Sequence, residues 1–281
     1  MKFKFGASYN VFDDSLELLE KSINCIRENI DFISVVYQDI SNYGQKADCD
    51  IKQFLESLLI KNKIDEIVFF EPQLEKGPHF NEIQKRNIGL QKSINKNCNY
   101  HISLDSDEFY LKSEFDFLID FINKNEPKST YCQLRTYYKD LNFQISPPEE
   151  YYVSLFYKID KNSTYLFGCK APVNVDPTRK MYTLPHKLIV KLYKIFGVKL
   201  KDIDPEKNVI FSREQIEMHH MSYVRDNFRK KIFNSSALCN FEKEAEEIVR
   251  YFENYQFPQK ALMAGKPPVY YDVIKTNYNW D

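Results

Sequence analysis

The segment Tyr100-His101-Ile102-Ser103-Leu104-Asp105-Ser106-Asp107-Glu108-Phe109 changes character after Leu104, where three acids follow within four positions. This pattern predicts a buried strand that ends in an acidic loop. In an extended chain residues i and i+2 point to the same side, so Asp105 and Asp107 can both offer oxygens to one hard cation, Mg²⁺ or Mn²⁺. An ion held by two carboxylates keeps open positions for phosphates. The alternative is an acidic loop that caps a helix beginning near Ser113.

The composition is that of a soluble globular protein and excludes several classes. Of 281 residues, 43% are hydrophobic and 28% charged, and the formal net charge of -1 gives no general attraction to nucleic acid. The six cysteines are scattered without a Cys-x-x-Cys pair, so neither disulfides nor a zinc site is expected. The absence of a long apolar run and of a signal-peptide core predicts a cytoplasmic protein, with no transmembrane helix.

Strands and helices alternate four times in the first part of the chain. The predicted strands are residues 3–7, 31–37, 66–70 and 100–104, separated by helices that begin near residues 13, 51 and 81. Apolar strands alternating with helices predict a parallel sheet covered on both faces, with ligands bound beyond the carboxyl ends of its strands. Ser8, Asp39 and Asp105 follow three of these strands. Since no Gly-rich phosphate loop is present, a diphosphate would need a metal ion to neutralise it.

The second half has a different pattern. The segments 130–138 and 151–159 are β-rich and predict antiparallel additions to the sheet. We expect one domain over residues 1–257, with a nucleotide-binding half (1–125), an acceptor-side half (126–257) and an irregular tail (258–281). An amphipathic helix at 185–196 carries a lysine face, which indicates either a solvated surface or peripheral contact with an anionic membrane.

Two adjacent histidines, His219 and His220, lie near the end of a predicted strand. Neutral imidazole is a suitable further ligand for a divalent ion. Because neighbouring strand residues face opposite ways, at most one of the two is expected to reach the metal.

Three segments in order resemble the motifs of bacterial family 2 glycosyltransferases. Lys85-Arg86-Asn87-Ile88-Gly89-Leu90 resembles their Arg-Asn-x-Gly helix, and Leu104-Asp105-Ser106-Asp107-Glu108 their Asp-x-Asp-Glu loop. His220-Met221-Ser222-Tyr223-Val224-Arg225 resembles the distal His-x-Gly/Ser-Tyr/Trp-Val-Arg segment, with Ser222 where Gly is common. The opening segments Ala7–Asn10 and Asp31–Val36 also look similar. The resemblance covers roughly residues 3 to 110 and 216 to 232.

This resemblance implies a GT-A fold, which is a Rossmann-like, mostly parallel α/β sheet flanked by helices. It implies a nucleotide-sugar donor, expected to be a UDP sugar, and an acceptor hydroxyl on a bacterial surface glycan or glycolipid. The implied ion is Mn²⁺ or Mg²⁺, with Asp105, Asp107 and His220 as ligands. The donor would contact Ala7, Ser8, Asp39, Arg86, Asn87, Asp105 and Ser106. The alternatives are a surface salt bridge for Arg86 and capping or turn roles for Ser8 and Asp39.

An inverting transfer needs a carboxylate near the acceptor hydroxyl. Asp176, Glu149 and Glu150 are the candidates, with Asp176 preferred although a turn before Pro177 also explains it. The second acidic motif of the family is not clear here, so the stereochemistry stays open.

Other classes of protein fit the sequence less well. A phosphatase with an aspartyl nucleophile would carry its Asp-x-Asp on an early strand, whereas here the motif follows the fourth. A nucleotidyltransferase would need a Gly-rich, basic first loop, which is missing. A non-catalytic nucleotide- or sugar-binding domain remains an alternative, and the sequence gives no indication of the oligomeric state.

Overall fold

The computed structural model describes residues 2–168, 171–182, 207–234, 242–265 and 267–276. The helices are α1 (Leu16–Ile26), α2 (Ile51–Ile60), α3 (Pro78–Asn95), α4 (Lys112–Asn125), α6 (Phe228–Phe233) and α7 (Glu242–Glu253). The strands are β1 (Phe5–Val11), β2 (Phe32–Tyr37), β3 (Glu66–Phe69), β4 (Tyr100–Leu104), β5 (Glu108–Phe109), β6 (Ser129–Tyr138), β7 (Asp140–Ser146), β8 (Tyr152–Lys158), β9 (Thr164–Tyr165), β10 (Met181–Tyr182), β11 (Asn208–Ile210), β12 (Glu217–Tyr223), β13 (Ala261–Met263) and β14 (Val269–Lys275).

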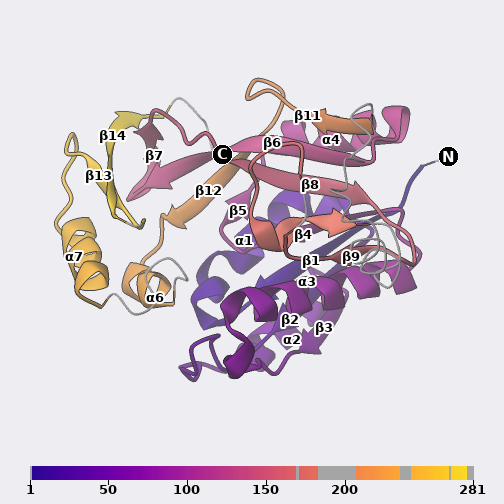
Figure 1. The fold of residues 1–281 in the computed structure, drawn as a ribbon, viewed down its shortest axis with the longest axis horizontal. Coiled ribbons are helices and arrows are strands. Elements are labelled where there is room, and N and C mark those ends of the chain that lie inside the picture. Colours follow the sequence, from indigo (N-terminus) through magenta and orange to yellow (C-terminus); the bar gives the residue numbers. More distant parts are fainter. Residues whose placement is uncertain (1, 169–170, 183–206, 235–241, 266, 277–281) are drawn as a thin grey trace, which may run out of the picture.

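One large mixed sheet organises these elements (Figure 1). Its order is β13-β14-β7-β6-β8-β4-β1-β2-β3, and the four strands β4, β1, β2 and β3 run parallel. Strands β8, β6, β7, β14 and β13 continue the sheet in antiparallel fashion, while β11 and β12 lie parallel to β6. The predicted α/β class, with a parallel nucleus and antiparallel additions in the second half, is confirmed.

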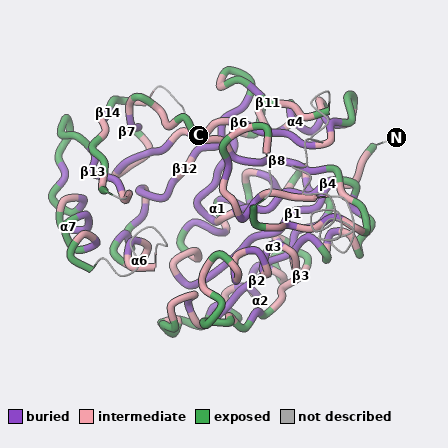
Figure 2. Tube along the Cα trace, in the orientation of Figure 1, coloured by how far each residue is buried: buried purple, intermediate pink, exposed green. Residues whose placement is uncertain are grey.

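The two faces of β1 differ in chemistry. Phe5, Ala7, Tyr9 and Val11 belong to the main hydrophobic core, together with apolar residues of α1, α2 and α4. Figure 2 shows the central strands as buried, and every residue of β1 is buried. On the opposite face small or polar residues alternate with the apolar ones, because strand side chains point alternately to the two sides.

Helix α3 packs closely on this second face because glycines remove side chains from the contact. A Cβ added to Gly89 would lie 2.3 Å from the Cβ of Ser8, and one added to Gly6 would lie 2.4 Å from Ser93 Oγ. The predicted boundary of the first strand is wrong. β1 continues past Ala7 to Val11, so Ser8 is an interior strand residue beneath a helix and not a loop residue.

The C-terminal region also departs from the sequence prediction. The tail expected to be irregular contains β13 and β14, and β14 pairs with β7 through Asp272↔Ser146 to Lys275↔Phe143. The run Val269–Ile274 is rich in β-branched and aromatic residues, which favour strands, although prolines and a glycine precede it. Helices α6 and α7 cover this extension with a separate hydrophobic cluster. The predicted helix at 185–196, and the membrane contact suggested by its lysines, fall outside the described residues.

No helix in the described ranges is long and apolar enough to cross a membrane.

Candidate functional site

A polar cavity of about 420 Å³ lies at the carboxyl ends of β1, β2 and β4. The beginning of α3, the 3₁₀ helix Pro177–Arg179 and α6 complete its wall. Its lining side chains form two groups. The charged end comprises the lining residues Asp105, Asp107, Arg86 and Lys231, together with Arg179 and Arg225, which are outside the described lining and pair with Asp105 and Asp107. The amide end comprises Asn10, Gln38, Asn42 and Glu82.

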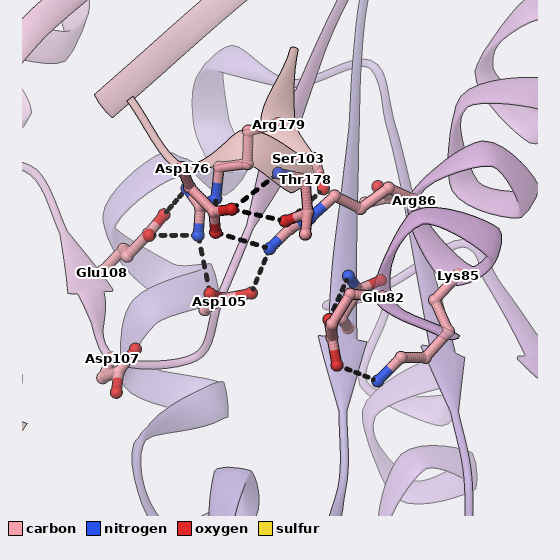
Figure 3. A network of polar contacts seen from close by, with 12 residues as sticks. Glu82, Lys85, Arg86, Ser103, Asp105, Asp107, Glu108, Asp176, Thr178 and Arg179 are labelled. Atoms are coloured by element: carbon pink, nitrogen blue, oxygen red, sulfur yellow. Dashed lines mark hydrogen bonds and ion pairs between the residues drawn. The ribbon is translucent and has the colours of Figure 1, made fainter. Parts of the chain in front are cut away.

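Arg86 is a buried cation at the floor of the charged end. It is 1% exposed and donates hydrogen bonds to Ser103 Oγ (2.8 Å), Thr178 Oγ1 (3.3 Å) and Asp105 Oδ1 (3.3 Å). Figure 3 shows these contacts, which come from β4 with the loop after it and from the 3₁₀ helix Pro177–Arg179. The alternative interpretation of Arg86 as a surface salt bridge is therefore wrong. Removal of Arg86 would leave buried polar partners without a hydrogen bond, so Arg86 also stabilises the fold.

Arg179 closes the network from the opposite side. Its guanidinium donates to Asp105 Oδ2 (2.7 Å) and to both carboxylate oxygens of Glu108, and the Arg179 and Glu108 side chains are 4% and 5% exposed (Figure 3). Burial would raise the pKa of Asp105, but Arg179 and Arg86 hold that pKa well below its usual range. Asp105 is therefore ionised, with both oxygens bonded to arginines.

Asp107 has its own set of cations. Its Oδ2 lies 3.0 Å from Arg225 Nη2, 3.0 Å from Lys231 Nζ and 3.9 Å from His220 Nε2. Burial would raise the pKa of Asp107, but Lys231, His220 and Arg225 hold it well below its usual range. The Asp-x-Asp-Glu motif thus meets the third motif here, since Arg225 ends the His-x-Ser-Tyr-Val-Arg segment.

The predicted three-ligand metal set is not formed. In the described part of the chain no three His, Cys, Asp or Glu side chains are grouped so that they could hold a metal ion. Asp105 is the residue that does not fit, because both its oxygens are occupied by arginines. Asp107 also has cations beside it, since Arg225 and Lys231 each lie 3.0 Å from its Oδ2, so a divalent ion there would have to displace Lys231. With Lys231 displaced, Asp107 and His220 fit as a pair, because a carboxylate oxygen and an imidazole nitrogen 3.9 Å apart are suitable donors for a hard divalent ion.

The two histidines separate as strand alternation predicted. His219 is buried and meets the Tyr137 hydroxyl at 2.9 Å, whereas His220 faces Asp107. His220 Nδ1 lies 3.3 Å from Thr136 Oγ1, and the same hydroxyl donates to Glu149. The side chains of Glu149, Thr136 and His220 therefore form a continuous line of polar contacts that ends at Asp107.

The three candidate bases lie in different environments. Asp176 lines the cavity, but its Oδ1 accepts bonds from Thr178 N (2.7 Å) and Thr178 Oγ1 (2.8 Å), the capping role that its position before Pro177 suggested. Glu149 accepts a hydrogen bond from the Thr136 hydroxyl, which also meets His220. Glu150 is exposed in the loop after β7. Only Asp176 of the three is among the residues described as lining the cavity.

Several predicted donor contacts do not lie at the cavity and are corrected here. Ala7 and Ser8 are fully buried in β1, and Ser8 Oγ meets His101 Nε2 at 3.4 Å. Asp39 is exposed and lines a neighbouring hollow with Tyr37 and Phe69. The Asn87 side chain pairs with the backbone of Tyr165, which anchors β9 on α3. Ser106, by contrast, does line the cavity.

Sequence reasoning missed the residues that complete the charged end and the amide end. Arg179 follows the Asp-Pro-Thr turn and Lys231 lies in a basic stretch of α6, and neither position carries a distinctive pattern. Asn10 and Gln38 could have been predicted from their positions at strand ends. Each stands at the carboxyl end of a parallel strand, one or two positions from residues that were named instead.

The fold and the site together define an α/β protein with a polar cavity at the carboxyl edge of a parallel sheet. No family model and no curated protein matches the chain. Among solved structures, S. aureus TarS 1-349 in complex with UDP-GlcNAc is 15% identical, with 89% of this chain and 73% of that chain covered at a TM-score of 0.43. GalNAc-T7 with UDP, GalNAc and Mn²⁺ is 16% identical (48% and 23% covered, TM-score 0.36), and the mannosyltransferase Ktr4p from S. cerevisiae in complex with GDP is 15% identical (50% and 43% covered, TM-score 0.32). These likenesses are too distant to transfer a residue's role or a substrate to this chain.

Proposed function

We propose that the protein is a GT-A glycosyltransferase, which transfers a sugar from a nucleoside-diphosphate sugar to an acceptor hydroxyl. One observation carries the proposal. Three segments that are far apart in sequence and resemble the family's motifs contribute Arg86, Asp107 and Arg225 to the walls or immediate surroundings of one cavity. That cavity lies at the carboxyl ends of parallel strands, where α/β sheets bind ligands.

The cavity's charge supports a divalent ion as a partner of the donor. Five carboxylates (Asp14, Glu82, Asp105, Asp107 and Asp176) and three cations (Lys85, Arg86 and Lys231) are described among its lining residues. Arg179 and Arg225 at the charged end add two positive charges and Glu108, which pairs with Arg179, adds one negative charge, so six carboxylates face five cations. Because these cations are already paired with carboxylates, a diphosphate would need a further cation to neutralise it. Asp107 and His220 would hold Mn²⁺ or Mg²⁺, which supplies positive charge at the departing diphosphate. Lys231 competes with the ion for the same carboxylate.

The protein's own residues would then position the reacting groups. Arg86 and Arg179 fix Asp105 in one place, so that it can accept hydrogen bonds from donor hydroxyls without moving. Asp176 is the only predicted base in the described lining, and it would take the acceptor proton. By the resemblance alone, the acceptor belongs to a bacterial surface glycan or glycolipid.

The proposal is tested by following a panel of UDP, GDP and CMP sugars by ³¹P NMR with Mg²⁺ or EDTA. We expect release of the free nucleotide without a sugar phosphate, loss of turnover in EDTA and recovery on adding metal. Asp176→Asn should bind the donor normally but lose transfer, with Glu150→Gln as the matched control outside the cavity. Release of a sugar phosphate from a UDP or GDP sugar would indicate nucleotidyl transfer instead. Binding without turnover of any panel member would indicate a binding protein.

A further inference from the structure

The amide end of the cavity contains two buried oxygen atoms without hydrogen-bond partners. They are Asn10 Oδ1 and Gln38 Oε1, on residues that are 7% and 1% exposed. Both residues line the cavity. A buried polar atom without a partner is costly, and a bound ligand is one way in which such an atom is satisfied. These two atoms therefore point to a ligand that donates hydrogen bonds.

One carboxylate fixes which amide atoms are left over. Glu82 accepts bonds from Asn10 Nδ2 (3.3 Å) and Asn42 Nδ2 (2.9 Å), and Lys85 Nζ lies 2.8 Å from it. A carboxylate only accepts, so both amides must present their NH₂ groups to it. The Asn42 oxygen then faces Gln38, whose Nε2 donates to it at 3.3 Å.

The remaining atoms of Asn10 and Gln38 are consequently oxygens, because rotating either amide would break a bond to its partner. Burial raises the pKa of Glu82, but the positive charges of Lys85 and Arg86 lower it by more, so the net shift of the pKa is downward. The carboxylate therefore stays ionised and acts only as an acceptor. Both side chains project to the α3 side of neighbouring parallel strands, since Asn10 pairs with Val36 in register and Gln38 follows two residues later. The result is a fixed pair of acceptors at one end of the cavity.

The chemistry of the ligand follows from this pair. Phe12, Tyr43 and His79 also line the cavity, and their flat rings suit a flat aromatic ligand. In Figure 3 Glu82, which accepts bonds from the amides, lies on the opposite side of Asp105 from Asp107. If the diphosphate of the proposed donor lies at the charged end, its nucleobase is the part that reaches the amides.

We propose that Asn10 and Gln38 read the hydrogen-bond donors of the nucleobase and select guanine. The guanine edge carries two adjacent donors, N1–H and the 2-amino group, which match two acceptors. Uracil offers N3–H alone between two carbonyl oxygens, so one protein oxygen would face another acceptor or stay unpaired. This inference rests on the proposed function, and it differs from the UDP donor that the family resemblance implies.

The test compares GDP, IDP and UDP by isothermal titration calorimetry on the full chain in one buffer with Mg²⁺. IDP is guanosine diphosphate without the 2-amino group, so it removes one donor and leaves the rest of the ligand unchanged. We expect GDP to bind roughly tenfold or more tightly than IDP or UDP, which is the scale for one buried unpaired acceptor. UDP binding as tightly as GDP, or GDP and IDP binding equally, would overturn the inference.

Two variants locate the effect. Gln38→Met keeps the side-chain length but removes the acceptor, and it should weaken GDP by roughly tenfold while changing UDP less. Asp39→Asn is the matched control, because Asp39 is the next residue but is exposed outside the cavity. An equal loss for GDP and UDP in Gln38→Met would indicate a merely structural role and would contradict base selection.

The outcomes separate this inference from the proposed function. Turnover of a UDP sugar with no preference for GDP would support glycosyl transfer and contradict guanine selection. Tight, Gln38-dependent binding of GDP without transfer from any nucleotide sugar would support the base site and contradict the proposed enzymatic function.

Discussion

The two ends of the cavity satisfy their polar groups in opposite ways. At the charged end, Asp105 and Asp107 already have buried cations as partners. At the amide end, Asn10 and Gln38 each keep an acceptor oxygen without a partner. A ligand must compete with internal ion pairs at the first end, whereas at the second it only fills open positions. The comparison predicts that mutations at the charged end affect folding and binding together, and mutations at the amide end affect binding alone.

The largest effect is expected for Asp107→Ala. The substitution leaves Arg225 and Lys231 beside each other without their shared carboxylate, and breaking such a buried pair costs about 3–5 kcal/mol. Urea unfolding should show this loss, and turnover should disappear. Asp39→Ala is the control and should change stability by no more than about 0.5 kcal/mol, as is usual at exposed positions. A stable, active Asp107→Ala variant would contradict the claim that the charged end serves both folding and binding.

The next effect concerns the competition between Lys231 and a divalent ion. Lys231 Nζ lies 3.0 Å from Asp107 Oδ2, so its positive charge opposes a second cation at the same oxygen. Lys231→Met should therefore tighten Mn²⁺ binding by about tenfold or more, measured by electron paramagnetic resonance of free Mn²⁺ without nucleotide. Arg229→Met is the control, because Arg229 lies on the same helix but pairs with exposed Glu246. Equal or weaker Mn²⁺ binding in Lys231→Met would separate Asp107 from the metal site.

A pH effect is expected from the layer beneath the cavity. His101 is fully buried between Ser8 and Ser93, and burial, assisted by the charge of Arg86, lowers its pKa to about 3. Between about pH 3 and 6.5 the unfolded chain binds a proton that the folded chain does not, so stability falls as the pH falls through this window. The slope is at most about 1.4 kcal/mol per pH unit.

The measurement is the difference between wild type and His101→Gln in unfolding free energy from pH 7 to 5. The difference matters because burial raises the pKa of Glu114 to about 7, which changes stability in the opposite direction in both proteins. We expect the advantage of the wild type to shrink as the pH falls. A pH-independent difference would show that folding does not lower the pKa of His101.

The smallest effect on stability is expected at the amide end. Gln38→Met gives up one 3.3 Å bond to Asn42 but also removes a buried acceptor without a partner. These contributions oppose each other, so the unfolding free energy should change by less than about 1 kcal/mol. A loss as large as that of Asp107→Ala would show that Gln38 serves the fold and would contradict the contrast between the ends.

The sequence predicted the parallel nucleus well because its signals are local. Apolar strands, helical spacing and the acids after Leu104 placed Asp105 at the carboxyl edge of the sheet, whereas Arg86 was predicted from the resemblance of its segment to a family motif. The same reasoning failed at Ser8, because a polar residue beneath a closely packed helix looks like a loop residue. Asp39 was predicted from its place at the end of the second strand, although the preceding residue, Gln38, is the one that lines the cavity.

The remaining site residues could not be predicted, because their positions depend on long-range packing. Arg179 reaches Asp105 from a segment 74 residues later, and Lys231 reaches Asp107 from a helix of the second half. Without those contacts the two aspartates looked free to share one metal ion. The structure shows that each is held by different cations, which makes His220 the nearer partner of Asp107.

A crystal structure with a bound nucleotide sugar tests most directly whether the two ends of the cavity serve one donor. We expect its base against Asn10 and Gln38 and its diphosphate beside Asp107, with Lys231 moved away from the carboxylate if a metal ion is present. A nucleotide bound in the neighbouring hollow of Tyr37, Asp39 and Phe69, or lying with its base at the charged end, would contradict this assignment.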